Sequence, residues 1–349
     1  MLERYFDNAS TTPVDPRVFE AMLPFLSNEC GNADSIHQWG RSARNAVEEA
    51  RSALAMLLGA EDPSEIIFTS GATEANNWVI SQFSSVAISP FEHASVREPA
   101  LRRGAEVLQN SGYAIESSIR SPDLLSVMLV NNETGAIIDS PETTSAVHRD
   151  VTQGLGKVEF NVKSMDFASM SAHKLYGPKG AGALYVRGAR FLEPLLLGGS
   201  QESSRRAGTL NVPGIVGFGR AAELARLELG LNYEHALDLR SAFLSELESP
   251  ITHDGGKNSP YILSLSFSGI QGESLVIELD RRGFGVSAGA ACSAASPEPS
   301  HVLQALDIQE PNLRGTIRVS MGRFNTIEAA LELGRALQTT AAKLQAACT

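Results

Sequence analysis

The sequence predicts an α/β protein whose mainly parallel sheet is covered by helices on both faces. Continuous apolar runs at 66–69, 127–130 and 183–186 are typical of strands that are buried on both sides. Stretches with apolar residues at helical spacing, at 41–58 and 217–248, alternate with these runs or follow them. This alternation is the pattern of a layered sheet with helical connections.

The C-terminal part of the chain predicts a smaller α+β unit. Residues 261–267 and 314–320 alternate as strands do, residues 274–279 have helical spacing, and a closing helix is expected from about Thr326. We therefore expect a large domain over residues 15–230. The small domain would combine residues 1–14 with residues 231–349.

Composition restricts the possible partners. The chain of 349 residues has 29 Lys and Arg against 40 Asp and Glu, a net charge of −11. This acidity argues against nucleic acid or an anionic membrane surface as the main partner, but a small anionic ligand stays possible. No apolar run approaches the ~20 residues that span a bilayer. The first residues lack a signal-peptide pattern, so we expect a cytoplasmic protein.

The three cysteines argue against a disulfide framework. Cys30, Cys292 and Cys348 are far apart and show no CxxC or Cys/His metal spacing, so neither disulfides nor a structural metal are expected. Cys292 differs from the other two because small residues surround it from Ser287 to Ser300. Such a segment suits a mobile, accessible loop with a reactive thiolate, although an inert cysteine is the alternative.

Other segments contain groups that could bind a cofactor. Lys174 lies in a stretch with Ser171, His173 and a Gly-Pro turn, where a neutral amine could attack an aldehyde. A solvated lysine at a loop edge fits this segment equally well. Small residues at 69–76 follow a strand and open a helix, so they could bind a phosphate or serve as a plain N-cap.

Two single residues are weaker candidates. Asp150 could keep a pyridine nitrogen protonated, and His93 could stack on a ring and move protons. Taken alone, each is more often a structural residue.

These segments, in this order, resemble the cysteine desulfurases of the NifS and IscS kind. This group belongs to the class V aminotransferases among the fold-type I enzymes that depend on pyridoxal 5'-phosphate. The resemblance runs from about Tyr5 to Thr326. The matching stretches are 5–13, 31–37, 70–76, 92–93, 131–135, 150–153, 171–180, 201–209, 292–300 and 318–326.

The resemblance implies a role for each matching residue. Lys174 would form the Schiff base with pyridoxal phosphate and later move protons on the substrate. Asp150 would pair with the ring nitrogen, Gln153 would bind the ring oxygen, and His93 would stack on the ring. The phosphate would be held by Ala72, Thr73, Ser171 and His173, with Thr209 supplied by the neighbouring subunit of a homodimer.

The same resemblance implies the substrate and the reaction. Asn132 and Arg318 would fix the carboxylate of L-cysteine, for which an arginine offers a bidentate fork. Cys292 would take the substrate sulfur as a persulfide, leave L-alanine, and pass the sulfur to an acceptor protein for iron–sulfur clusters, thio-cofactors or tRNA. Alternatives are a selenocysteine lyase, another class V aminotransferase, or a non-catalytic scaffold. Ala33 and Arg149 depart from the usual pattern of the family.

Overall fold

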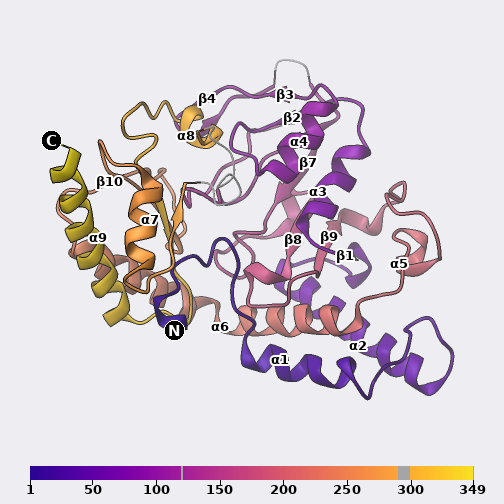
Figure 1. Cartoon of the computed structure of the whole chain (residues 1–349). Helices are drawn as coiled ribbons and strands as arrows, with labels where there is room; N and C mark the ends of the chain where they lie inside the picture. Colours follow the sequence, from indigo (N-terminus) through magenta and orange to yellow (C-terminus); the bar gives the residue numbers. More distant parts are fainter. Residues whose placement is uncertain (119–120, 290–298, 349) are drawn as a thin grey trace.

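Two sheets organise the part of the chain that the computed structural model describes, residues 1–118, 121–289 and 299–348 (Figure 1). The larger sheet is mainly parallel, as predicted. Its pairs from β8 to β3 are parallel, whereas β9 is antiparallel to both of its neighbours. The strand order is β1 (Ile66–Thr69), β9 (Gly182–Val186), β8 (Phe167–Ser171), β7 (Ala146–Asp150), β6 (Leu124–Ser126), β2 (Val86–Ile88) and β3 (Glu106–Val107).

Helices cover both faces of this sheet. On one face the core is formed with α1 (Pro16–Met22), α2 (Gln38–Leu58) and α6 (Val212–Ser245). On the other face it is formed with α3 (Ala72–Ser81) and α4 (Ala94–Arg102). The predicted helices at 41–58 and 217–248 correspond to α2 and α6, and the fold class is confirmed. Helix α2 ends at Gly59, whose φ of 68° is the left-handed conformation that favours glycine.

The smaller sheet is antiparallel and packs on two helices, which lie beside it near both chain ends in Figure 1. Helix α6 contributes Leu224 to the core of the large sheet and Phe243 to the core of the small one. The predicted domain boundary at residue 230 falls inside this helix and stays a prediction. The elements are β10 (Ile251–Thr252), β11 (Ile262–Ser266), β13 (Thr316–Ser320), β12 (Ser287–Ala288), α7 (Gly272–Asp280) and α9 (Ile327–Cys348).

Three further short elements lie outside the two sheets. They are the hairpin of β4 (Asn110–Ser111) and β5 (Ala114–Ile115), the helical turn α5 (Gln201–Ser204), and helix α8 (His301–Ala305).

The predicted strand at 127–130 is wrong in position. The strand is β6, at Leu124–Ser126, and Val130 makes only an isolated bridge to Ile137. The run is apolar because it is buried where the chain leaves the sheet for the loop at 131–135. That loop closes at Gly135, which has a φ of 80° and where a Cβ atom would lie 2.5 Å from the Ile262 carbonyl oxygen.

Among the described residues, no helix is long and apolar enough to cross a membrane. These residues contain no group of three His, Cys, Asp or Glu side chains that could hold a metal ion. Cys30 is an exposed free cysteine.

A buried ion pair joins three elements of the large sheet region. Arg51 of α2 lies 2.8 Å from Glu202 of α5, and the Glu202 side chain is fully buried. The other oxygen of Glu202 accepts a hydrogen bond of 2.9 Å from the Phe68 amide in β1. The pair therefore anchors the start of the segment that leads to Thr209.

We expect Glu202→Gln to lower the free energy of unfolding by about 3 kcal/mol, because it leaves the buried Arg51 guanidinium with only the largely exposed Glu48 as a counter-charge. Urea unfolding measures this change. The matched control is Asp139→Asn, which removes an ion pair with Lys257 whose side chains are 77% and 66% exposed. That control should change the stability by less than about 0.5 kcal/mol. Equal effects of the two substitutions would contradict the expectation.

Candidate active site

Strand ends and loops of the large sheet meet at one cavity of about 980 Å³. Strand β9 lies antiparallel between β1 and β8, so β1 and β8 run in the same direction. The carboxyl ends of β1, β8 and β7 therefore meet at the same edge, where ligands bind in sheets of this kind. The cavity is lined by His93, Asn132, Asp150, Gln153, Ser171, His173, Lys174 and Arg318, together with Ala72 and Thr73.

The Lys174 amine is held against the N-terminal segment of the chain. Lys174 follows β8 in a single 3-10 turn (Ala172–Lys174), and its Nζ donates to the carbonyl oxygens of Ala9 and Ser10 at 2.5 Å each. Thr12 holds the same turn, because its amide donates to the His173 carbonyl at 2.9 Å. Contacts between strand β8 and the N-terminal segment thus place the amine at the cavity wall.

One corner of the cavity suits a phosphate group. It lies at the N-terminus of α3, where the Ala72 amide donates to Ser171 Oγ at 2.7 Å and Thr73 is exposed. Backbone atoms approach closely here, since a Cβ atom on Gly182 would lie 2.4 Å from the Gly71 Cα atom. Backbone N–H groups at a helix start, with a serine hydroxyl beside them, are donors that a phosphate accepts from.

His173 borders this corner in its neutral form. Burial lowers the pKa of its imidazole to about 4, and the nearby charges of Lys174 and Lys179 act in the same direction. Its Nδ1 lies 3.1 Å from the Thr11 hydroxyl. A neutral imidazole can still donate one hydrogen bond to an anion.

Asp150 lines the same cavity, and each of its buried carboxyl oxygens accepts one hydrogen bond. The Asn76 side-chain amide donates to Oδ2 at 2.9 Å, and the Thr152 backbone amide donates to Oδ1 at 3.0 Å. The Asn76 side-chain amide also donates to Ser95 Oγ, and this hydroxyl lies 2.8 Å from His93 Nδ1. His93 itself begins helix α4 as its N-cap.

Gln153 of the cavity wall and Lys157, which is outside the described lining, form a buried pair. Gln153 donates through Nε2 to the Ala9 carbonyl at 2.9 Å and accepts through Oε1 from Lys157 at 3.4 Å. Burial lowers the pKa of Lys157 to about 7, with further contributions from Lys174 and Arg318. The sequence shows that lysines are scarce, but nothing in it separates Lys157 from the others.

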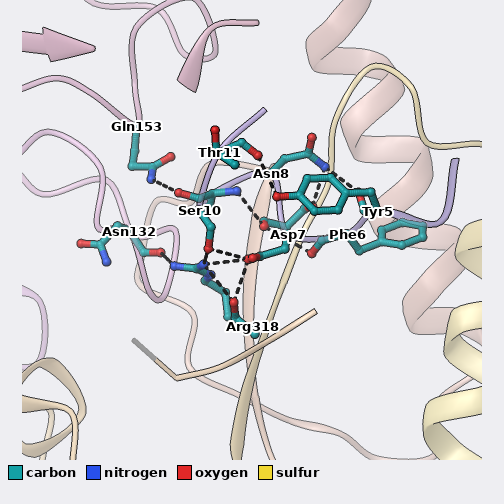
Figure 2. A network of polar contacts seen from close by, with 12 residues as sticks. Tyr5, Phe6, Asp7, Asn8, Ser10, Thr11, Asn132, Gln153 and Arg318 are labelled. Carbon is teal, nitrogen blue, oxygen red and sulfur yellow. Dashed lines mark hydrogen bonds and ion pairs between the residues drawn. The ribbon is translucent and has the colours of Figure 1, made fainter. Parts of the chain in front are cut away.

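Arg318 lines the cavity within a dense polar network (Figure 2). Its Nη1 donates to the Asn132 carbonyl at 2.9 Å, and its Nη2 donates to Asp7 at 2.8 Å and to Ser10 Oγ at 2.6 Å. Ser287 of β12 also donates to Asp7, at 2.8 Å. Sequence reasoning missed Asp7, Ser10 and Ser287 as neighbours of Arg318, because no local pattern shows contacts between residues that are distant along the chain.

Thr209 lies outside the described lining of this cavity, and Cys292 lies outside the described residues. Thr209 is exposed and is absent from the described lining, whereas the prediction assigned it to the site of a neighbouring subunit. Cys292 and residues 290–298 lie outside the described residues. Gly289 and Pro299, which flank this segment, both line the cavity. Beyond it, Ser300 donates to the buried Glu133 at 2.5 Å.

Comparison with known proteins decides the family. Residues 4–333 match the model of the Aminotransferase class-V family. A cysteine desulfurase IscS of Dictyoglomus turgidum is 40% identical over 360 residues, which cover 93% of this chain and 91% of that protein. The chain belongs to the class-V aminotransferases and, among them, to the cysteine desulfurases. The predicted family is thus confirmed.

Solved structures agree with this family. A NifS-like protein superposes with a TM-score of 0.90 at 33% identity and covers 98% of this chain and 100% of its own. SspA in complex with cysteine superposes with a TM-score of 0.81 at 30% identity and covers 93% of this chain and 100% of its own. These likenesses confirm the predicted fold-type I architecture.

We expect His173 to make the protein less stable as the pH falls from about 6.5 to about 4. The pKa is lowered on folding, so between these values the unfolded chain binds a proton that the folded chain does not. Stability is full above this window and is lost as the pH falls through it. His173→Gln should therefore show a shallower fall in unfolding free energy, measured by urea titration across the window. Parallel profiles of variant and wild type would contradict this, since His148 and His301, whose pKa values burial also lowers, contribute equally to both.

Proposed function

We propose that this chain is a pyridoxal-phosphate-dependent cysteine desulfurase. It would remove sulfur from L-cysteine, release L-alanine and hold the sulfur as a persulfide on Cys292. The observation that carries the proposal is that the Lys174 amine, the Asp150 carboxylate and the Arg318 guanidinium line the same cavity. Membership of a family in which relatives of 38–40% identity are cysteine desulfurases supports the same assignment.

The donor set fits pyridoxal phosphate. The start of α3, with Ala72, Thr73, Ser171 and His173, would hold the phosphate, and Lys174 offers the amine for the Schiff base. When bound, this cofactor supplies an electron sink for the electrons of the substrate α-carbon. Asp150 would keep a proton on the ring nitrogen, since Asn76 and the Thr152 amide hold it as an acceptor. The Gln153 amide would donate to the ring oxygen.

The remaining groups would orient the substrate and move its protons. Arg318 and Asn132 would hold the carboxylate of L-cysteine, and His93, which lines the same cavity, would stack on the ring. Lys174 would take and return a proton at the α-carbon. The protein SspA, which is similar in structure, has been solved in complex with cysteine. This supports cysteine as the substrate here.

Cys292 would act as the nucleophile toward the substrate sulfur. Its thiolate would form a sulfur–sulfur bond while the bond between the substrate β-carbon and sulfur breaks. The electron pair of that bond passes to carbon, which is protonated to give L-alanine. The persulfide would then pass its sulfur to an acceptor protein. This step separates a desulfurase from a transaminating relative, which needs no thiol.

The two residues Lys174 and Cys292 should separate cofactor binding from sulfur transfer. We expect Lys174→Ala to lose the yellow absorbance band of the bound cofactor and to release no sulfide from cysteine. Cys292→Ala should keep that band but lose at least about 100-fold in sulfide release with reductant present. Absorbance spectra and a sulfide assay measure both. A Cys292→Ala protein with wild-type sulfide release would show that the proposal is wrong.

We further propose a homodimer in which Thr209 completes the phosphate site of the partner. A mixed dimer of one Lys174→Ala chain and one Thr209→Val chain tests this, because both changes would fall in one site. The other site would be intact and bind pyridoxal phosphate with wild-type affinity. If Thr209 served its own chain, that intact site would not form. Fluorescence titration of differently tagged, co-purified chains separates the outcomes, with both homodimers as controls.

A further inference from the structure

Asp7 is a carboxylate in the cavity to which the proposed reaction gives no role. Its Oδ1 accepts from Arg318 Nη2, Ser10 Oγ and Ser287 Oγ, each at 2.8 Å. Figure 2 shows the Asp7 side chain in contact with the guanidinium end of Arg318. The Asn132 backbone carbonyl contacts the same guanidinium from another side. This arrangement places an internal carboxylate on the arginine that would bind the substrate carboxylate.

The donors of Arg318 show why the two carboxylates compete. A guanidinium offers two faces to a bidentate carboxylate, Nε with Nη2 and Nη1 with Nη2, so Nη2 belongs to both. Nη2 has two hydrogens, and its short contacts are to Asp7 at 2.8 Å and Ser10 at 2.6 Å. Nε is buried and has no hydrogen-bond partner among the described residues. A substrate carboxylate can therefore bind at two points only if Nη2 gives up one of these contacts.

The contact with Asp7 is the one that a substrate would replace. Arg318 is buried, with 3% of its side chain exposed, and Asp7 is the acidic residue that pairs with it in the described structure. A buried cation needs an anionic partner, which Asp7 supplies here and a substrate carboxylate could supply in its place. Ser10 donates to Asp7 as well and can remain on the arginine as a neutral acceptor.

We propose that Asp7 is an internal competitor for Arg318. The Asp7 carboxylate binds this arginine until a substrate carboxylate replaces it. This inference rests on the proposed function, because it treats Arg318 as the substrate-binding arginine. L-cysteine and L-alanine have the same carboxylate, so tight binding of that group would slow product release without assisting the chemistry. By returning to Arg318, Asp7 weakens this shared contact and favours the departure of alanine.

The test is the affinity of the holoenzyme for propanoate, which has a carboxylate but no amine that could react with the cofactor. We expect Asp7→Asn to lower the Kd for propanoate by about tenfold in isothermal titration calorimetry, because a charge-assisted contact no longer has to be given up. The KM for L-cysteine should fall in parallel, with no rise in kcat. An unchanged or weaker affinity for propanoate would overturn the proposal.

The matched control is Asp254→Asn. Asp254 pairs with Arg240 at 2.6 Å outside the cavity lining, and the two side chains are 31% and 14% exposed. Asp254→Asn should leave the affinity for propanoate unchanged. If its affinity rose as much as that of Asp7→Asn, the proposal that Asp7 competes for Arg318 would be overturned. Arg318→Met should abolish propanoate binding. If this variant bound propanoate as tightly as the wild type, Arg318 would not be the carboxylate-binding residue and the proposal would be overturned. Sulfide release by the wild type tests the desulfurase function separately.

A second variant covers a failure of Asp7→Asn to fold. Asp7→Ser also removes the charge and leaves room for water, and the same tenfold expectation applies, to order of magnitude. Circular dichroism establishes folding before each titration. If neither variant folds while Asp254→Asn does, Asp7 is a structural requirement and the proposal is overturned.

Discussion

The site depends on the N-terminal segment from Asp7 to Thr12, which lies between the two sheets and bonds to both. Its carbonyl oxygens accept from Lys174 and Gln153 of the large sheet region, while Asp7 and Ser10 accept from Arg318 of the small sheet. The edge of the large sheet alone would supply the amine and the Asp150 carboxylate. This segment, together with the Asn132 carbonyl, holds the arginine of the other sheet in a fixed relation to them.

The cavity gathers cations within an acidic protein. Lys174 and Arg318 line it, whereas the chain as a whole has a net charge of −11. Burial keeps His173 neutral near this group, so it does not add a further charge. The carboxylates of Asp7 and Asp150 line the same cavity, so a bound anion would respond to this mixed local field and not to the net charge of the chain.

The sequence predicted elements with a continuous or periodic pattern of apolar residues. It did not predict elements that bury polar side chains. The apolar run of β9 and the periodic helix α2 were recognisable from their patterns. Strand β7 was not, because it ends in His148, Arg149 and Asp150, all buried in the sheet. The residues of the proposed site were found through ordered motifs. Asp7, Ser287 and Lys157 were missed because their roles arise from contacts that no local pattern encodes.

The antiparallel pairing of β8 with β9 restricts where this chain can change its length. Ser171 and Gly182 are paired across the two strands, so residues 172–181, including Lys174, form the closed connection of a hairpin. A parallel neighbour would require a longer crossover, in which an inserted residue could be absorbed. Here the pairing of β8 with β9 fixes both ends of the connection. One added residue would therefore displace the Lys174 amine from the Ala9 and Ser10 carbonyls. Insertions and deletions among relatives should therefore avoid this connection and collect in surface loops.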